Sequence, residues 1–311
     1  MPNPREAPST TAPVNLLGGI ALRLCAMLGL ALMFVTVKLV ADEGIHIAES
    51  LFWRQAFALP FILLWVMTHG GLRAVRTRRI WAHGRRAAMG LTGMALNFGG
   101  VILLPLAEAT TISLSVPIFA TIFAALLLRE PVGRARWSAV LLGFVGVFVV
   151  LQPGGMGAFD GPHMTGALVA LAGAIVTALI TIAVRDLGRT ETTVGIVFWF
   201  TALSLIPLGA ALPFVWTPHS AEQWGLLVLL GLSGAVTQML LTGALRLAPV
   251  SVVIPMDYSS LLWSVAFGWW FFGTLPATTT WLGAPIIIGS GLFIAWREHV
   301  KAVERAKEIA A

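Results

Sequence analysis

The sequence predicts an all-α integral membrane protein in which ten transmembrane helices form two inverted repeats of five. Composition is the first observation, because 58% of the 311 residues are hydrophobic and only 11% are charged, whereas soluble domains contain about 25% charged residues. The second is a series of apolar stretches that are each long enough to cross a bilayer. The third is a set of weak internal matches that relate the two halves of the chain.

Span boundaries follow from the rule that a crossing needs about 20 apolar residues. The predicted spans are residues 16–41, 50–68, 87–106, 109–128, 135–151, 164–184, 193–213, 223–245, 249–272 and 281–297. The predicted organisation is a disordered N-terminal tail (1–15), a first repeat (16–151), an outer linker (152–163), a second repeat (164–297) and a cytoplasmic C-terminal tail (298–311).

Basic residues predict the orientation of the spans, because Lys and Arg concentrate in cytoplasmic loops. With both termini inside, all but three of the 20 Lys and Arg residues fall in inner segments, chiefly 73–86 and 129–136, and the segment 156–163 is outside. The three exceptions lie within spans: Arg23, Lys38 and Arg54. This placement explains the net charge of +6 without a nucleic-acid partner, so the lipid bilayer is the predicted partner.

Three short segments of the first half match segments of the second half in the same order. The pairs are Phe52–Ala56 with Phe198–Ala202, Asn97 with Gln238, and Gly146–Phe148 with Gly291–Phe293. Five crossings are an odd number, so the second copy enters from the opposite side and the repeats are inverted. Inverted repeats are typical of secondary transporters, whose substrate site lies near the midplane between the halves. The predicted function is therefore transport of a small-molecule solute.

Span nine carries the strongest candidate site residue, Asp257, two residues after Pro255. A carboxylate inside a span is costly, which favours a functional role facing a cavity or a partner, although a structural contact with a neighbouring helix is the alternative. Ser260 and Ser264 follow at i+3 and i+7 and share the helix face of Asp257. Asp257 is predicted either to pair with a cationic group of the solute or to carry a coupling proton.

Span four repeats this design, with Thr110, Ser113 and Pro117 at the same spacing. Proline removes a backbone donor and frees a carbonyl, so Pro117 and Pro255 predict helix breaks beside a hydrated cavity. Ordinary kinks and hydrogen bonds between helices are the alternative explanation.

Four further side chains are candidates for the cavity wall. Asn97 and Gln238 lie mid-span at matching positions, and both are predicted to face one central cavity. Tyr258 and Trp263 either stack on the solute or pack between helices.

Two basic residues near the outer ends of spans one and two complete the set. Lys38 and Arg54 either attract an anionic group of the solute or extend toward the outer headgroups. The positive-inside rule explains neither residue.

Competing classes are a multipass enzyme acting on a lipid and a receptor-like channel. An enzyme needs a nucleophile, an acid–base pair or a metal cluster, and the spans offer only the isolated Asp257 and Glu108. The sequence has neither a Walker-type loop nor an H-E-x-x-H helix, so no cofactor or metal is predicted. Coupling would then come from a proton or from solute exchange.

Two segments carry a family resemblance, L-P-L-A-E-A-T-T-I-S-L-S-V-P at residues 104–117 and A-P-V-S-V-V-I-P-M-D-Y-S-S-L at residues 248–261. They resemble the fourth and ninth helices of ten-helix EamA-type members of the drug/metabolite transporter superfamily. Two departures are Arg129, which replaces the small residue of the family's L-G-E, and Thr274, which replaces its second-half Glu. The resemblance implies secondary transport or exchange of small metabolites, often export, in a bacterial inner membrane. The sequence leaves open whether the protein forms a homodimer.

Overall fold

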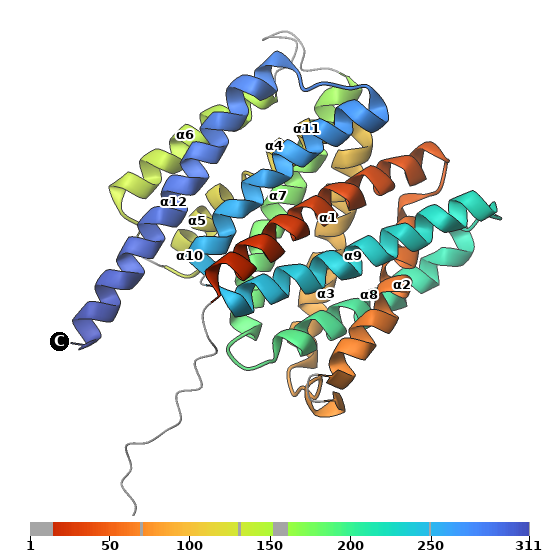
Figure 1. Ribbon diagram of the computed structural model, residues 1–311, viewed down its shortest axis with the longest axis horizontal. Coiled ribbons are helices and arrows are strands. Elements are labelled where there is room, and N and C mark those ends of the chain that lie inside the picture. The colour runs from red at the N-terminus through yellow and green to blue at the C-terminus, as the bar shows by residue number, and fades with distance from the viewer. Residues whose placement is uncertain (1–14, 69–70, 130–131, 152–160, 249, 311) are drawn as a thin grey trace, which may run out of the picture.

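The computed structural model describes residues 15–68, 71–129, 132–151, 161–248 and 250–310, and every regular element in these ranges is helical (Figure 1). The elements of the first half are α1 (Leu16–Asp42), α2 (Ile47–Thr68), η1 (Gly71–Arg73), α3 (Ile80–Leu103), α4 (Leu106–Ser113), α5 (Val116–Leu127) and α6 (Arg134–Val150). Those of the second half are α7 (Pro162–Leu187), α8 (Thr193–Val215), α9 (Ala221–Leu247), α10 (Val250–Val253), η2 (Ile254–Tyr258), α11 (Ser259–Phe272) and α12 (Thr278–Ala310).

Ten crossings are present in the described part of the chain. Eight are helical stretches long and apolar enough to span a bilayer, with α4 and α5 counted together. The other two are the 17-residue α6 and the interrupted run of α10, η2 and α11. The predicted all-α fold with ten transmembrane helices is therefore confirmed.

Helix packing shows the internal symmetry. α1 packs along α9 while α7 packs along α3, and likewise α1 contacts α11 while α7 contacts α5. Other contacts join equivalent helices of the two halves, namely α2 with α8, α4 with α11 and α6 with α12. Each of these contacts maps onto itself or onto another when the halves are exchanged, as a pseudo-two-fold axis between inverted repeats requires. The halves interleave, because α1 lies between α11 and α9 (Figure 1).

Crossings four and nine are both interrupted beside a proline. α4 ends at Ser113 and α5 begins at Val116, with Pro117 in the first turn of α5. In the second half, Pro255 lies in the 3-10 turn η2 between α10 and α11. Proline lacks the amide donor that would continue the α-helical pattern, so each crossing restarts as a new helix.

The same two crossings end in the same backbone conformation. Gly273 follows α11 with a φ of 61°, and Arg129 follows α5 with a φ of 53°. Glycine adopts this left-handed conformation freely. For a residue with a side chain, the same conformation is unfavourable by about 1–2 kcal/mol. Arg129 thus adopts a strained conformation where the family pattern has a small residue.

We expect Arg129→Gly to raise the free energy of unfolding by about 1 kcal/mol, because it removes this strain. Thermal unfolding of the purified protein in detergent measures the change. Arg134→Gly is the matched control, since it removes an exposed arginine from the start of the α6 helix, where glycine is unfavourable. A melting temperature of Arg129→Gly at or below that of the wild type would contradict the prediction.

The ends of the predicted segments differ in detail from the structure. Residues 1–14 and 152–160 lie outside the described residues, while Asn15 caps α1 by accepting from the Gly18 amide at 2.8 Å. The last two residues of the predicted outer linker, Pro162 and His163, already belong to α7. In the predicted C-terminal tail, α12 continues as a helix through Ala310.

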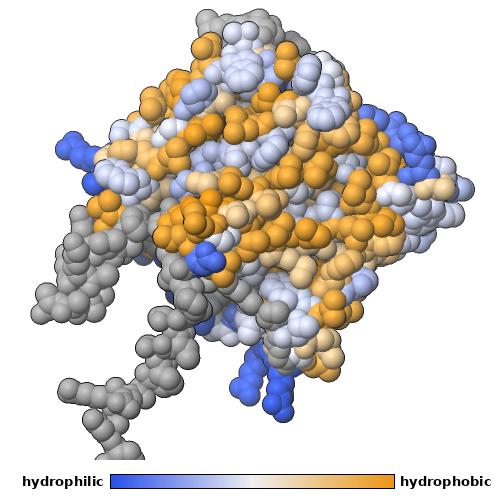
Figure 2. All heavy atoms as spheres, in the orientation of Figure 1, coloured by the Kyte–Doolittle hydropathy of each residue, from blue (hydrophilic) through white to orange (hydrophobic). Residues whose placement is uncertain are grey.

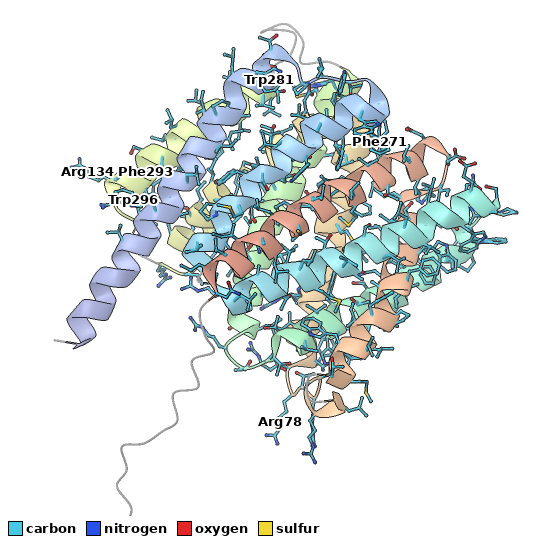
Figure 3. The ribbon with its side chains drawn as sticks, in the orientation of Figure 1. Arg78, Arg134, Phe271, Trp281, Phe293 and Trp296 are labelled. Carbon is cyan, nitrogen blue, oxygen red and sulfur yellow. The ribbon has the colours of Figure 1, made fainter. Side chains whose placement is uncertain are left out.

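Hydrophobic side chains cover much of the surface, as Figure 2 shows for one face. Exposed members include Leu141, Phe148, Leu262, Trp270 and Trp281. Lipid is the solvent that suits such a surface. In Figure 3 the labelled Arg78 lies at the lower edge and Arg134 at the left edge, whereas Trp281 lies at the top and Phe271 at the upper right.

Candidate functional site

The carboxylate of Asp257 binds Arg23 of α1. Arg23 Nε donates to Asp257 Oδ1 at 2.5 Å and Nη2 donates to Oδ2 at 2.6 Å. The break at η2 places Asp257 beside α1, and its side chain keeps 32% exposure against 11% for Arg23. The sequence analysis identified both residues as charges inside spans but did not predict that they form an ion pair. A bidentate ion pair of this kind fixes α1 against crossing nine and neutralises both charges.

The two aromatic candidates of crossing nine, Tyr258 and Trp263, make separate contacts away from the Asp257 ion pair. The hydroxyl of Tyr258 packs against Gly291 of α12, where a β-carbon would collide with it. Trp263 is 36% exposed and its ring lies 6.2 Å from that of Phe267. Tyr258 thus packs between helices, and Trp263 lies near the surface.

The predicted polar stripes meet between crossings four and nine. Thr110 and Ser264 share a hydrogen bond of 2.8 Å, and Ser264 is fully buried. Ser260 donates to the Asp257 carbonyl at 2.7 Å, and Ser113 donates to the Ala109 carbonyl at 3.0 Å. These hydroxyls are satisfied by the protein, and the Thr110–Ser264 contact joins the two interrupted helices.

Asn97 and Gln238 are both half-buried. Asn97 Nδ2 donates to Thr177 Oγ1 on α7 at 3.1 Å and to the Gly93 carbonyl at 2.7 Å. On α9, the Gln238 carbonyl accepts from Thr242 at 2.9 Å. The Asn97 amide therefore joins α3 to α7, and its position with Gln238 in one cavity stays a prediction.

The side chain of Lys38, on α1, contacts the C-terminal end of α3. Its Nζ donates to the Leu104 carbonyl at 2.8 Å and to the Val101 carbonyl at 3.4 Å, and lies 5.6 Å from the centroid of the Phe272 ring. The last carbonyls of a helix lack intrahelical partners and carry partial negative charge. Lys38 stabilises this helix end.

On one side of the molecule, the loop between α2 and α3 contacts the loop between α7 and α8. Thr77 Oγ1 donates to Glu191 Oε1 at 2.8 Å, and Arg79 Nη2 pairs with Asp186 Oδ2 at 2.6 Å. The buried His83 at the start of α3 has its Nε2 3.6 Å from Glu191 Oε2. We call these five residues the Arg79 cluster.

At the other end of α2, the loop between α8 and α9 contacts the start of α2. His219 Nε2 and Glu49 Oε1 are 2.6 Å apart, and both side chains are fully buried. Gln223 Nε2 donates to Glu43 Oε2 at 3.3 Å. We call these four residues the His219 cluster.

The two clusters occupy equivalent places in the inverted repeats. Each joins the connection between the second and third helices of one repeat to the region between the first and second helices of the other. They lie at opposite ends of α2, whose 22 residues span about 33 Å. Sequence reasoning missed them because it treated polar loop residues as solvated connections, although an acidic residue or a histidine near a helix start could have signalled them.

Glu108 has partners as well, contrary to the sequence-based view of an isolated carboxylate. Its Oε2 lies 2.7 Å from His163 Nε2 at the start of α7, and its Oε1 accepts from the Ala277 amide at 3.3 Å. Two surface hollows lie elsewhere, one beside Trp269 and Trp270 and one between α6 and α12. None of the predicted cavity residues lines either hollow.

Comparison with known proteins agrees with this architecture. The model of the EamA-like transporter family matches twice, over residues 17–152 and 164–296. A riboflavin transporter of Rhizobium johnstonii is 33% identical over 286 residues, which cover 91% of this chain and 89% of the relative. A pseudopaline exporter of Pseudomonas aeruginosa is 27% identical over 87% of this chain and 93% of its own, and an S-adenosylmethionine uptake transporter of Rickettsia conorii is 29% identical over 85% and 87%.

A solved crystal structure has a TM-score of 0.58 at 17% identity, covering 88% of this chain and 95% of its own, and it supports the fold alone. The family and the named relatives are transporters rather than enzymes. The double match reproduces the two halves that pack around the pseudo-two-fold axis. The chain belongs to the EamA-like transporter family.

Proposed function

We propose that the protein is a secondary transporter that exports or exchanges a small organic metabolite by alternating access. It would act in a bacterial inner membrane, with both termini in the cytoplasm. The observation that carries this proposal is the equivalence of the Arg79 and His219 clusters on opposite sides of the fold. Each cluster ties one repeat to the other at one end of α2. Opening one while the other stays closed would admit solute from one side only.

The paired helix breaks support this motion. α4 contacts α11, and the Thr110–Ser264 hydrogen bond joins the interrupted crossings near the pseudo-axis. A helix break lets two rigid segments change their relative angle with little loss of internal hydrogen bonds. The repeats can therefore rock about crossings four and nine.

Of the two roles predicted for Asp257, its contact with Arg23 favours carriage of a coupling proton. A cationic solute would have to displace a guanidinium that already donates two hydrogen bonds. Protonation would neutralise the carboxylate and weaken its contact with Arg23, so proton binding would be coupled to the packing of α1 against crossing nine. The solute would then occupy a central cavity whose candidate wall residues include Asn97 and Gln238.

Flux from vesicles tests the proposal. Proteoliposomes are loaded with a bacterial metabolite extract, and mass spectrometry follows which compounds appear outside. We expect a few compounds to leave protein-containing vesicles and to respond to an imposed pH gradient. Protein-free vesicles are the control. An identical release profile with and without protein would sink the transport proposal.

A further inference from the structure

Four arginine and lysine side chains that point away from lipid or deviate from the positive-inside rule can be compared by the acceptors they find. They are Arg23, Lys38, Arg54 and Arg86. Arg23 binds a carboxylate and Lys38 binds helix-end carbonyls, so both have acceptors within the protein. Arg86 was placed in an inner loop by the sequence, but α3 begins at Ile80, and Arg86 lies well inside that helix. Arg54 and Arg86 form no ion pair with a described carboxylate.

Arg54 projects from α2 toward α9. Its Nη1 donates to Gln55 Oε1 at 2.8 Å, while its Nε is buried and has no acceptor among the described residues. The guanidinium lies against Gly234, where a β-carbon would be 3.2 Å from Nε. The glycine leaves room for the planar group, and the guanidinium keeps unused donors.

Arg86 lies against the second repeat. Its Cζ is 4.1 Å from the centroid of the Phe200 ring on α8, which is a cation–π contact. Its Nε and Nη1 are buried without an acceptor in the described part of the chain. Gly90, one turn along α3, provides space, since a β-carbon there would collide with Nη1. The ring fixes the guanidinium but accepts no conventional hydrogen bond from these two donors.

The two arginines lie between the clusters. Arg54 follows Glu49 of the His219 cluster along α2, and Arg86 follows His83 of the Arg79 cluster along α3. α2 and α3 run in opposite directions, so each arginine lies about one turn deeper in the membrane than its cluster. A solute entering past either cluster would meet an arginine first. Phe200, which holds Arg86, matches Arg54 in the repeated segments.

We propose, on the basis of the proposed function, that the solute is an organic anion whose carboxylate or phosphate binds Arg54 and Arg86 in turn. A buried cation without a partner is destabilising, and such a charge is retained where a ligand supplies the partner. The guanidinium fork matches the two oxygens of a carboxylate or phosphate. The unused donors of Arg54 and Arg86 indicate that the solute is negatively charged. Arg23 and Lys38 already have acceptors within the protein, so they do not indicate the charge of the solute.

Ligand-dependent thermal stability tests the inference. The purified protein in detergent is heated with the anionic, neutral or cationic fraction of a bacterial metabolite extract, separated by ion exchange at neutral pH. We expect the anionic fraction to raise the melting temperature, and the other two fractions to leave it unchanged. Phosphatase treatment of the anionic fraction abolishes the effect if the group is a phosphate monoester and preserves it if the group is a carboxylate. No stabilisation by the anionic fraction overturns the inference.

Variants connect the effect to the two arginines. Arg54→Met and Arg86→Met are each expected to weaken the response to the anionic fraction about 10- to 100-fold, since a hydrogen-bonded charge contact is lost. Without ligand, their melting temperatures should equal or exceed that of the wild type, because an unpartnered buried charge is removed. Arg85→Met, which removes the exposed neighbouring arginine, is the matched control and should leave the response unchanged.

Three outcomes distinguish arginines that bind an anionic solute from arginines that only stabilise the fold. Lower stability of either Met variant, with an unchanged response to anions, shows a structural arginine and overturns the inference. Arg54→Lys and Arg86→Lys keep the charge but lose the fork, so they should retain part of the response. Vesicle flux restricted to neutral or cationic compounds would overturn the anion inference while leaving the transport proposal intact.

Discussion

Asp257→Asn is expected to lower the free energy of unfolding by about 3–5 kcal/mol, because it leaves the partly buried Arg23 without its carboxylate. We also expect most solute flux to be lost, since Asn keeps the shape of the side chain but cannot carry a coupling proton at neutral pH. Thermal unfolding in detergent and flux from vesicles measure the two effects. Glu222→Gln, which alters an exposed carboxylate in the first turn of α9, is the control and should change either quantity little.

A double variant separates the structural and functional parts of this effect. Arg23→Gln combined with Asp257→Asn removes both charges, so most of the lost stability should return, because the isolated buried charge is gone. Flux should stay low if Asp257 carries the proton. Recovery of both stability and flux would show that the ion pair only holds α1 against crossing nine.

The second large effect concerns the two clusters. Glu49→Gln removes the carboxylate that contacts His219, and Glu191→Gln removes the one that binds Thr77 and faces His83. A hydrogen bond to a charged group contributes about 1.5–3 kcal/mol, so each variant should shift the open-to-closed ratio on its own side about 10- to 100-fold. The two variants are expected to act on opposite sides of the membrane.

The fold could be predicted because its determinants are local. Each crossing needs only its own apolar stretch of residues. The breaks beside Pro117 and Pro255 also follow from one residue each, since a missing amide interrupts a helix wherever the chain goes next. Weak matches between the halves were enough to indicate inverted packing.

The contacts of the candidate site could not be predicted in the same way. Arg23 and Asp257 are 234 residues apart in the chain, and their pairing depends on how α1 lies beside crossing nine. Lys38 looked like a solute anchor because the carbonyls it binds, at the end of α3, become neighbours only in the folded protein. The two clusters involve residues of ordinary loop composition, which become informative only when the repeats are packed together.

Side-specific labelling of one buried residue tests alternating access most directly. Thr201 on α8 is 2% exposed and follows Phe200, so Thr201→Cys in a Cys25→Ala background reports access between the clusters. A membrane-impermeant maleimide is applied to right-side-out and inside-out vesicles. The account predicts faster labelling from outside in Glu49→Gln and faster labelling from inside in Glu191→Gln. Equal changes from both sides in each variant, or no change in either, would contradict it.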